Sequence, residues 1–254
     1  MKKLTAILLT LALVFAFAAC GGKTEPAQPT EAPAADAADT ASDAASDAAP
    51  VDATTAAPSE SEPKDLEIKS FDYYVADDYL YYVITIHNPN ANTAIELPSY
   101  RITAKSASGS ILGSYDHTLS IVYPGNDFVY ASQAFSISEE PADVKADLLP
   151  SEDYNIKKVS SLDHPEYTKL TVENTSVIED GFFTKMTGEI RNDNDYTIDS
   201  ACVCVVFRDA EGKVVASDST FVDFVAGGTT TPFDLSLYSD NLTDTYEVYA
   251  DIWD

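Results

Sequence analysis

Residues 203–215, VCVVFRDAEGKVV, contain two apolar runs separated by Glu211-Gly212. Runs rich in Val and Phe on either side of a glycine are typical of a β-hairpin, because Gly readily takes the positive φ that a tight turn needs. The same pattern occurs earlier in the chain at Ser108-Gly109, again between two apolar runs. The two stretches indicate an all-β protein whose sequence repeats.

The repeat has an offset of 103 or 104 residues. Matched pairs are Asn88 with Asn192, Ile102 with Val205, Gly125 with Gly228, and residues 144–148 with 248–252. Strand-like runs follow one another at roughly ten-residue spacing in both copies, about seven per copy. This number of strands in a copy of this size predicts two tandem immunoglobulin-like β-sandwich domains, without the Cys-Trp-Cys core of antibody domains.

Composition and repeat together divide the chain into five segments. Residues 20–64 are rich in Ala, Asp, Pro, Ser and Thr and lack aromatic side chains, so they cannot bury enough apolar surface to offset the entropy of ordering. We predict a signal peptide at 1–19, a disordered acidic linker at 20–64, a β-sandwich at 65–150, an interdomain linker at 151–167 and a second β-sandwich at 168–254.

The first twenty residues have the pattern of a secretory signal. Two lysines precede an apolar run from Leu4 to Phe17, and Ala18-Ala19-Cys20 follows. The run is shorter than the roughly 20 residues that span a bilayer. The Cys after two alanines resembles the lipobox of bacterial lipoproteins, although Phe17 stands where that family usually has Leu. The resemblance implies a diacylglyceryl group on Cys20 and a lipid-anchored, extracytoplasmic protein at the cell surface of a bacterium. An ordinary signal cut at a nearby Ala is the alternative.

The second copy also resembles the FxLYD repeat, a β-sandwich module of bacterial lipoproteins. The similar residues are Gly188 to Asn192, the hairpin 203–215, and a Gly-Gly turn followed by Phe233. Arg208 replaces the aromatic residue that the family has before its Asp, and the first copy keeps only the turn glycine. The family shares no catalytic residues, so the resemblance implies a binding role without enzymatic activity.

The charge of the chain narrows the choice of partners. The formal net charge is −27, and it becomes −29 when Lys2 and Lys3 leave with the signal. Such a surface repels phosphate backbones, so we expect no nucleic-acid partner. No motif predicts a cofactor. The three histidines, His87, His117 and His164, lie outside every catalytic motif, and we predict that they are solvated loop residues.

Tyrosines gather at the start of the first copy. Because Tyr82 aligns with Met186, we predict that it faces the core, whereas Tyr81 and Tyr79 face outward. Exposed tyrosines give contact area at low entropic cost. Tyr73, Tyr79 and Tyr81 are therefore a candidate recognition surface for a protein or glycan ligand. The alternative is a structural role, in which the rings pack against the second copy or cover a sheet edge.

Two further groups could bind a metal. Asp193, Asp195 and Asp199 are a weak calcium candidate, because alternating oxygen ligands suit Ca²⁺. The loop lacks the Gly and the Glu of an EF-hand, so we favour Asx turns that close a strand-to-strand loop. Cys202 and Cys204 lie two residues apart on one strand face. The repeat register predicts that this face is the outer one. Two exposed thiolates could bind a soft metal there, but no other Cys and no close His completes a tetrahedral site, so we favour a partly covered strand surface without a metal.

These observations favour a non-enzymatic binding, adhesion or spacer module, held at a membrane by its lipid. Two alternatives are an accessory subunit of an envelope or transport complex and a carboxylate-based hydrolase of cell wall or glycan. No acidic pair stands out in support of the hydrolase.

Replacement of Cys20 tests the membrane anchor. If Cys20 carries the lipid, Cys20→Ala should release the protein into the medium, because a single residue supplies both acyl chains. Cell fractionation and immunoblotting measure the release. Retention of Cys20→Ala on the membrane would count against acylation.

Overall fold

The computed structural model describes residues 62–180, 183–237 and 242–253. The predicted signal peptide, Cys20 and almost all of the predicted linker lie outside the described residues. The chain from Pro58 to Asp254 forms one compact unit. In its described part the regular structure is β-strand apart from two short 3-10 turns, Asp153–Asn155 and Val159–Ser161, which confirms the all-β prediction. No helix in the described ranges is long and apolar enough to cross a membrane.

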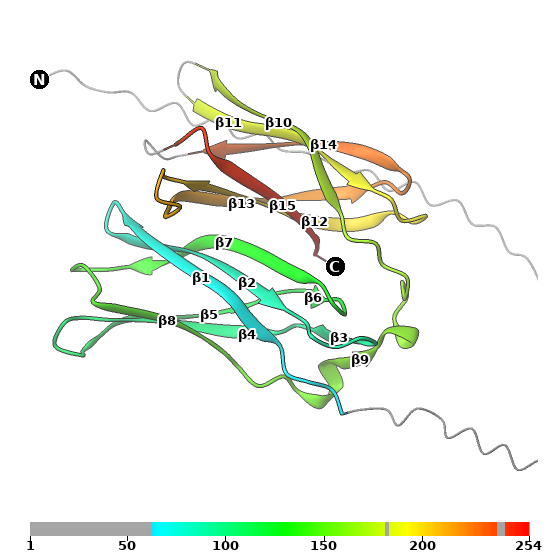
Figure 1. Cartoon of the computed structure of the whole chain (residues 1–254), viewed down its shortest axis with the longest axis horizontal. Helices are drawn as coiled ribbons and strands as arrows, with labels where there is room; N and C mark the ends of the chain where they lie inside the picture. The colour runs from blue at the N-terminus through cyan, green and yellow to red at the C-terminus, as the bar shows by residue number, and fades with distance from the viewer. Residues whose placement is uncertain (1–61, 181–182, 238–241, 254) are drawn as a thin grey trace, which may run out of the picture. The chain divides into compact units, whose positions relative to one another are not determined.

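The first copy is a sandwich of two antiparallel three-stranded sheets (Figure 1). One sheet has the order β1 (Glu67–Ala76), β2 (Tyr79–His87), β7 (Asp127–Ser136), and the other has the order β5 (Ile111–Thr118), β4 (Ser99–Lys105), β8 (Asp143–Leu148). Tyr82 of β2 and Tyr100 of β4 are fully buried between the sheets, and their hydroxyl oxygens are 2.8 Å apart. The predicted inward orientation of Tyr82 is confirmed.

The second copy has the same two layers. One sheet has the order β10 (Thr171–Asp180), β11 (Phe183–Asn192), β14 (Thr229–Leu237), and the other has the order β13 (Val214–Val225), β12 (Ile198–Arg208), β15 (Tyr246–Ile252). Met186 of β11 and Val205 of β12 pack in one core. Each strand lies at the repeat offset from its counterpart, and the turn glycines Gly109 and Gly212 both have φ of 83°.

The copies differ from the predicted seven strands each, for a local reason. In the second copy β12 and β13 are long and continuous, and its described residues form six strands. In the first copy the equivalent strands are split, and β3 (Thr93–Glu96) and β6 (Ile121–Val122) form a small separate sheet with β9 (Ile156–Lys158). The split follows Leu97-Pro98: Leu97 has φ of 49°, and Pro98 lacks an N–H for the ladder.

A buried asparagine pair recurs in both copies after the second strand. In the second copy Asn192 Nδ2 donates to the carbonyls of Tyr196 and Val225, and its Oδ1 accepts from the backbone and side chain of Asn194. In the first copy Asn88 Nδ2 likewise donates to two carbonyls, and its Oδ1 accepts from Asn90. These amides satisfy loop carbonyls inside the protein, which explains why both asparagines survive in the repeat.

The two copies also share a hydrophobic cluster, formed by the outer faces of two sheets. Val83, Val129 and Ala131 of the first copy pack with Cys204, Val206 and Val214 of the second. Side chains that point away from each sandwich core are thereby buried, and we call this contact the junction.

Substitution of Asn192 tests the loop network. Asn192→Ala removes two donors to buried carbonyls and should lower the free energy of unfolding by about 2–3 kcal/mol, because each unsatisfied group costs about 1–3 kcal/mol. Urea unfolding measures the loss. Asp195→Asn, in the same loop but exposed, is the control and should change little. Equal stability of the two variants would contradict the role of the network.

Candidate functional site

A tight hairpin places the tyrosines of the first copy. Asp77 and Asp78 connect β1 to β2 and have φ of 48° and 62°, as a two-residue turn of the I′ type requires. This turn pairs Tyr74 with Tyr81 and Tyr73 with Tyr82. Because paired residues point to the same face of a sheet, Tyr73 lies on the core side, where it packs against the first core, and Tyr74 lies outward with Tyr81 and Tyr79.

The structure therefore groups Tyr74, Tyr79 and Tyr81, which we call the tyrosine face. The rings of Tyr74 and Tyr81 stack with centroids 5.0 Å apart and planes at 8°. Tyr79 keeps 39% of its surface exposed. Of the predicted surface, Tyr79 and Tyr81 come together and Tyr73 does not. The predicted surface did not include Tyr74. A two-residue turn at Asp77-Asp78 would have paired Tyr74 with Tyr81 and so placed both on one face.

Tyr74 also links the two copies. Its hydroxyl accepts a hydrogen bond from the backbone N–H of Ser217 at 2.9 Å and donates to the Ser217 carbonyl at 3.2 Å. Burial raises the pKa of the Tyr74 phenol, so it stays a neutral donor. The neighbouring Asp218 has its pKa raised by burial as well. The inner edge of the tyrosine face is thus held in place by β13 of the second copy.

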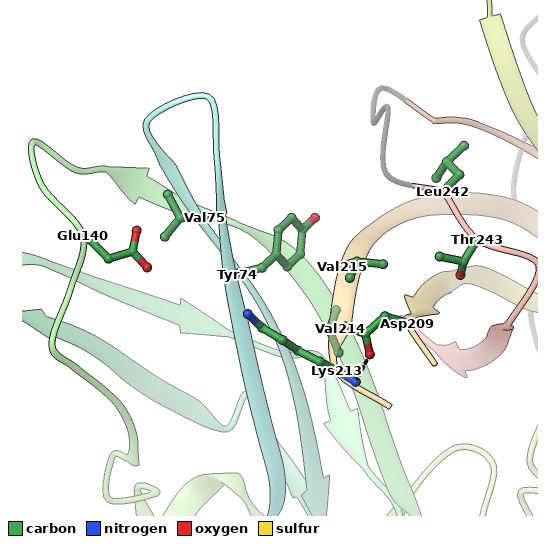
Figure 2. Close-up of a pocket in the computed structure, with 9 residues that line it drawn as sticks. All are labelled: Tyr74, Val75, Glu140, Asp209, Lys213, Val214, Val215, Leu242 and Thr243. Carbon is green, nitrogen blue, oxygen red and sulfur yellow. Dashed lines mark hydrogen bonds between the residues drawn. The ribbon is translucent and has the colours of Figure 1, made fainter. Parts of the chain in front are cut away.

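A cleft of about 550 Å³ opens beside Tyr74, between residues of both copies (Figure 2). We call it the junction cleft; it is lined by Tyr74, Val75, Glu140, Asp209, Lys213, Val214, Val215, Leu242 and Thr243. The Asp209 side chain forms hydrogen bonds within its own turn, because its Oδ1 accepts from the backbone N–H groups of Glu211 and Lys213. The volume lies within the roughly 300–1,000 Å³ of small-ligand sites.

A polar clasp joins the copies on another side of the junction. Asp251 of β15 is buried; its Oδ1 is 2.9 Å from Lys169 Nζ, and its Oδ2 accepts from the backbone N–H of Val129 at 3.3 Å. Lys169 also donates to the backbone carbonyl of Asp127. Burial raises the pKa of Asp251 to about 6, against the lowering effect of Lys169. The clasp therefore contains a carboxyl group that titrates in mildly acidic solution.

The histidines are more ordered than we predicted. His117 lies on β5 and not in a turn, with its ring 4.5 Å from that of Tyr130. Burial lowers its pKa to about 4, so it is neutral at pH 7. His87 Nδ1 is 2.7 Å from Asp127 Oδ1, and His164 stacks on Tyr196 at 3.6 Å. Among the described residues, the side-chain hydrogen-bond partners of these rings are Asp127 for His87 and Tyr115 for His117, and neither pair includes a Ser, Thr or Cys nucleophile.

The cysteine pair lies on the predicted outer face of its own sandwich, but it is buried more completely than the partly covered surface that we predicted. Cys202 and Cys204 do point away from the core of the second copy, but they keep only 2% and 0% of their surface because the first copy covers them. Burial raises the pKa of both thiols, which suppresses the thiolate that binds metals. The repeat register gave the correct face; it could not show that a second domain covers that face.

The calcium candidate residues lie around the asparagine loop. Asp193 Oδ1 accepts from Arg191 Nε at 2.7 Å, and Asp195 and Asp199 are exposed. Within residues 62–180, 183–237 and 242–253 no three His, Cys, Asp or Glu residues are grouped to hold a metal ion. The hydrogen bonds of the loop come from Asn192 and Asn194, as in the Asx-turn alternative.

Comparison with known proteins adds little. No protein-family description and no curated protein matches the chain. Among solved structures, the transglutaminase of red sea bream aligns with 74% of this chain and 31% of its own length, at 11% identity and a TM-score of 0.21. A TM-score this low says nothing about activity. The FxLYD resemblance stays a prediction.

The titration of Asp251 gives a testable pH dependence. The folded state keeps the Asp251 proton up to about pH 6, whereas an unfolded Asp loses it near about pH 4. The folded state thus binds more protons in this window, and the wild type loses stability as the pH rises through it. Asp251→Asn has no carboxyl group to titrate, so it does not lose this stability. The free energy of unfolding of the variant minus that of the wild type should therefore increase by about 2 kcal/mol between about pH 4 and 7.

Urea unfolding of both proteins at several pH values measures the difference. His117 contributes with the opposite sign, because its lowered pKa makes protonation unfavourable in the folded state. His117 is present in both proteins, so its contribution cancels. A difference that does not vary with pH would show that Asp251 is ionised throughout.

Proposed function

We propose that this protein is a lipid-anchored, extracytoplasmic lipoprotein whose paired β-sandwiches form a non-enzymatic binding module. The signal-like start, the alanine pair before Cys20 and the acidic linker support the location. The observation that carries the binding role is the tyrosine face, in which exposed Tyr79 lies beside a stacked pair that β13 holds in place.

The chemistry of this face suits neutral partners. Tyrosine rings offer an apolar surface for stacking, together with hydroxyls for hydrogen bonds. Burial, with Asp77 and Asp218 nearby, raises the pKa of Tyr81, so its hydroxyl keeps its proton. The net charge of −27 disfavours anionic partners. The partner we propose is an envelope glycan or a protein surface without strong negative charge.

Removal of the two outer rings tests the binding role. The combined variant Tyr79→Ala, Tyr81→Ala, in a soluble chain carrying Cys20→Ala, should bind isolated cell envelopes at least about tenfold more weakly, because aromatic anchors each contribute about 1–2 kcal/mol or more. Its free energy of unfolding should fall by no more than about 1.5 kcal/mol, the value of the lost ring stacking. Cosedimentation and urea unfolding measure the two effects.

Tyr154→Ala is the matched control, because Tyr154 is 69% exposed but lies in the segment between the copies. This variant should bind as the parent does. Unchanged envelope binding by the Tyr79, Tyr81 variant would remove the tyrosine face from the proposal.

A further inference from the structure

The junction cleft carries two opposite charges that have no partner among the residues that the structure describes. Glu140 and Lys213 both line the cleft, and neither side chain forms an ion pair or a side-chain hydrogen bond with any residue that the structure describes. Most other cations of the two sandwiches do have acidic partners, among them Lys69, Arg101, Lys185 and Arg208. The cleft therefore offers one anionic and one cationic group to a ligand.

The two charges come from different copies. Glu140 follows β7 in the first copy, and Lys213 lies in the β12–β13 turn of the second. Figure 2 shows Glu140 on the far side of Val75, while Lys213 extends from the opposite wall toward β1. The backbone N–H of Lys213 is held by Asp209 Oδ1 at 2.8 Å, which fixes the turn and leaves the ammonium group free to reach into the cleft.

The lining between the charges exposes more polar than apolar surface, but it includes an apolar wall. Tyr74, Val75, Val215 and Leu242 line it. Thr243 adds no free donor, because its Oγ1 already donates to the carbonyl oxygens of Arg208 and Thr245. The Tyr74–Ser217 hydrogen bonds join the two walls, so the cleft is largely formed before any ligand arrives.

We propose that the junction cleft binds a short zwitterionic peptide, with its terminal ammonium group at Glu140 and its terminal carboxylate at Lys213. The peptide body lies against Tyr74, Val215 and Leu242. Charge-assisted contacts at both ends orient the peptide, and the apolar wall accepts small side chains.

The distance between the two terminal charges distinguishes a peptide from a free amino acid. The charges of a free amino acid lie within one residue, whereas each extended residue adds about 3.3–3.6 Å between the ends of a peptide. Because Glu140 and Lys213 come from opposite walls of the cleft, the ligand we propose is a peptide and not a free amino acid. This site is distinct from the exposed Tyr79 and Tyr81 rings, so it goes beyond the proposed function and does not depend on it.

Trialanine is the probe for the test, in calorimetric titrations of the chain from residue 21 onward. We expect saturable binding that weakens about tenfold or more in Glu140→Gln and in Lys213→Gln, as the loss of one charge-assisted contact implies. Glu139→Gln and Lys145→Gln are matched controls, because both residues are exposed and lie outside the cleft, and these variants should bind like the parent.

Peptides with one terminus capped test which end of the peptide contacts Glu140 and which contacts Lys213. N-acetyl-trialanine should bind weakly and should lose nothing further in Glu140→Gln, whereas trialanine amide should be insensitive to Lys213→Gln. Tyr79→Ala should leave trialanine binding intact, because Tyr79 does not line the cleft, and this variant separates the site from the exposed part of the tyrosine face. Absence of saturable trialanine binding, or binding that persists in both cleft variants, would overturn the proposal.

Discussion

The packing of two outer sheet faces against each other is the constraint on which the rest of this structure depends. Val83, Val129 and Ala131 on one face meet Cys204, Val206 and Val214 on the other. An exposed apolar sheet face is a liability, and burial of each such side chain contributes about 1.5–3 kcal/mol. The contact turns two copies into one compact unit, and Tyr74, Lys169 and Asp251 add polar links around it.

The same contact accompanies a difference between the outer faces of the two copies. The positions in the second copy that match Val83 and Ala131 are Thr187 and Asp234, and those in the first copy that match Cys204 and Val206 are Arg101 and Thr103. Each copy is therefore apolar on the one outer face that meets its neighbour and polar on the other.

The candidate sites follow from the junction. Tyr74 belongs to the tyrosine face through its stack with Tyr81 and to the junction cleft through its position beside Val215. Its hydroxyl is bound to Ser217, so a change in how the copies pack would move both sites together. Asp251, which is buried and titrates near pH 6, is the charged group whose state bears most directly on that packing.

By itself, the sequence determined the β-class, the two copies, the glycine turns and the inward orientation of Tyr82, Val203 and Val205, because strand alternation and turn conformation are local properties. The register of the first hairpin is also a local property. With the Asp77-Asp78 turn recognised, the predicted recognition surface would have contained Tyr74 in place of Tyr73. Only the tertiary structure decided that Cys204 is buried, that Asp251 meets Val129, and that Glu140 and Lys213 line one cleft. These contacts join residues more than forty positions apart across two separately formed sandwiches. Their geometry depends on how complete surfaces fit together, which no local periodicity encodes.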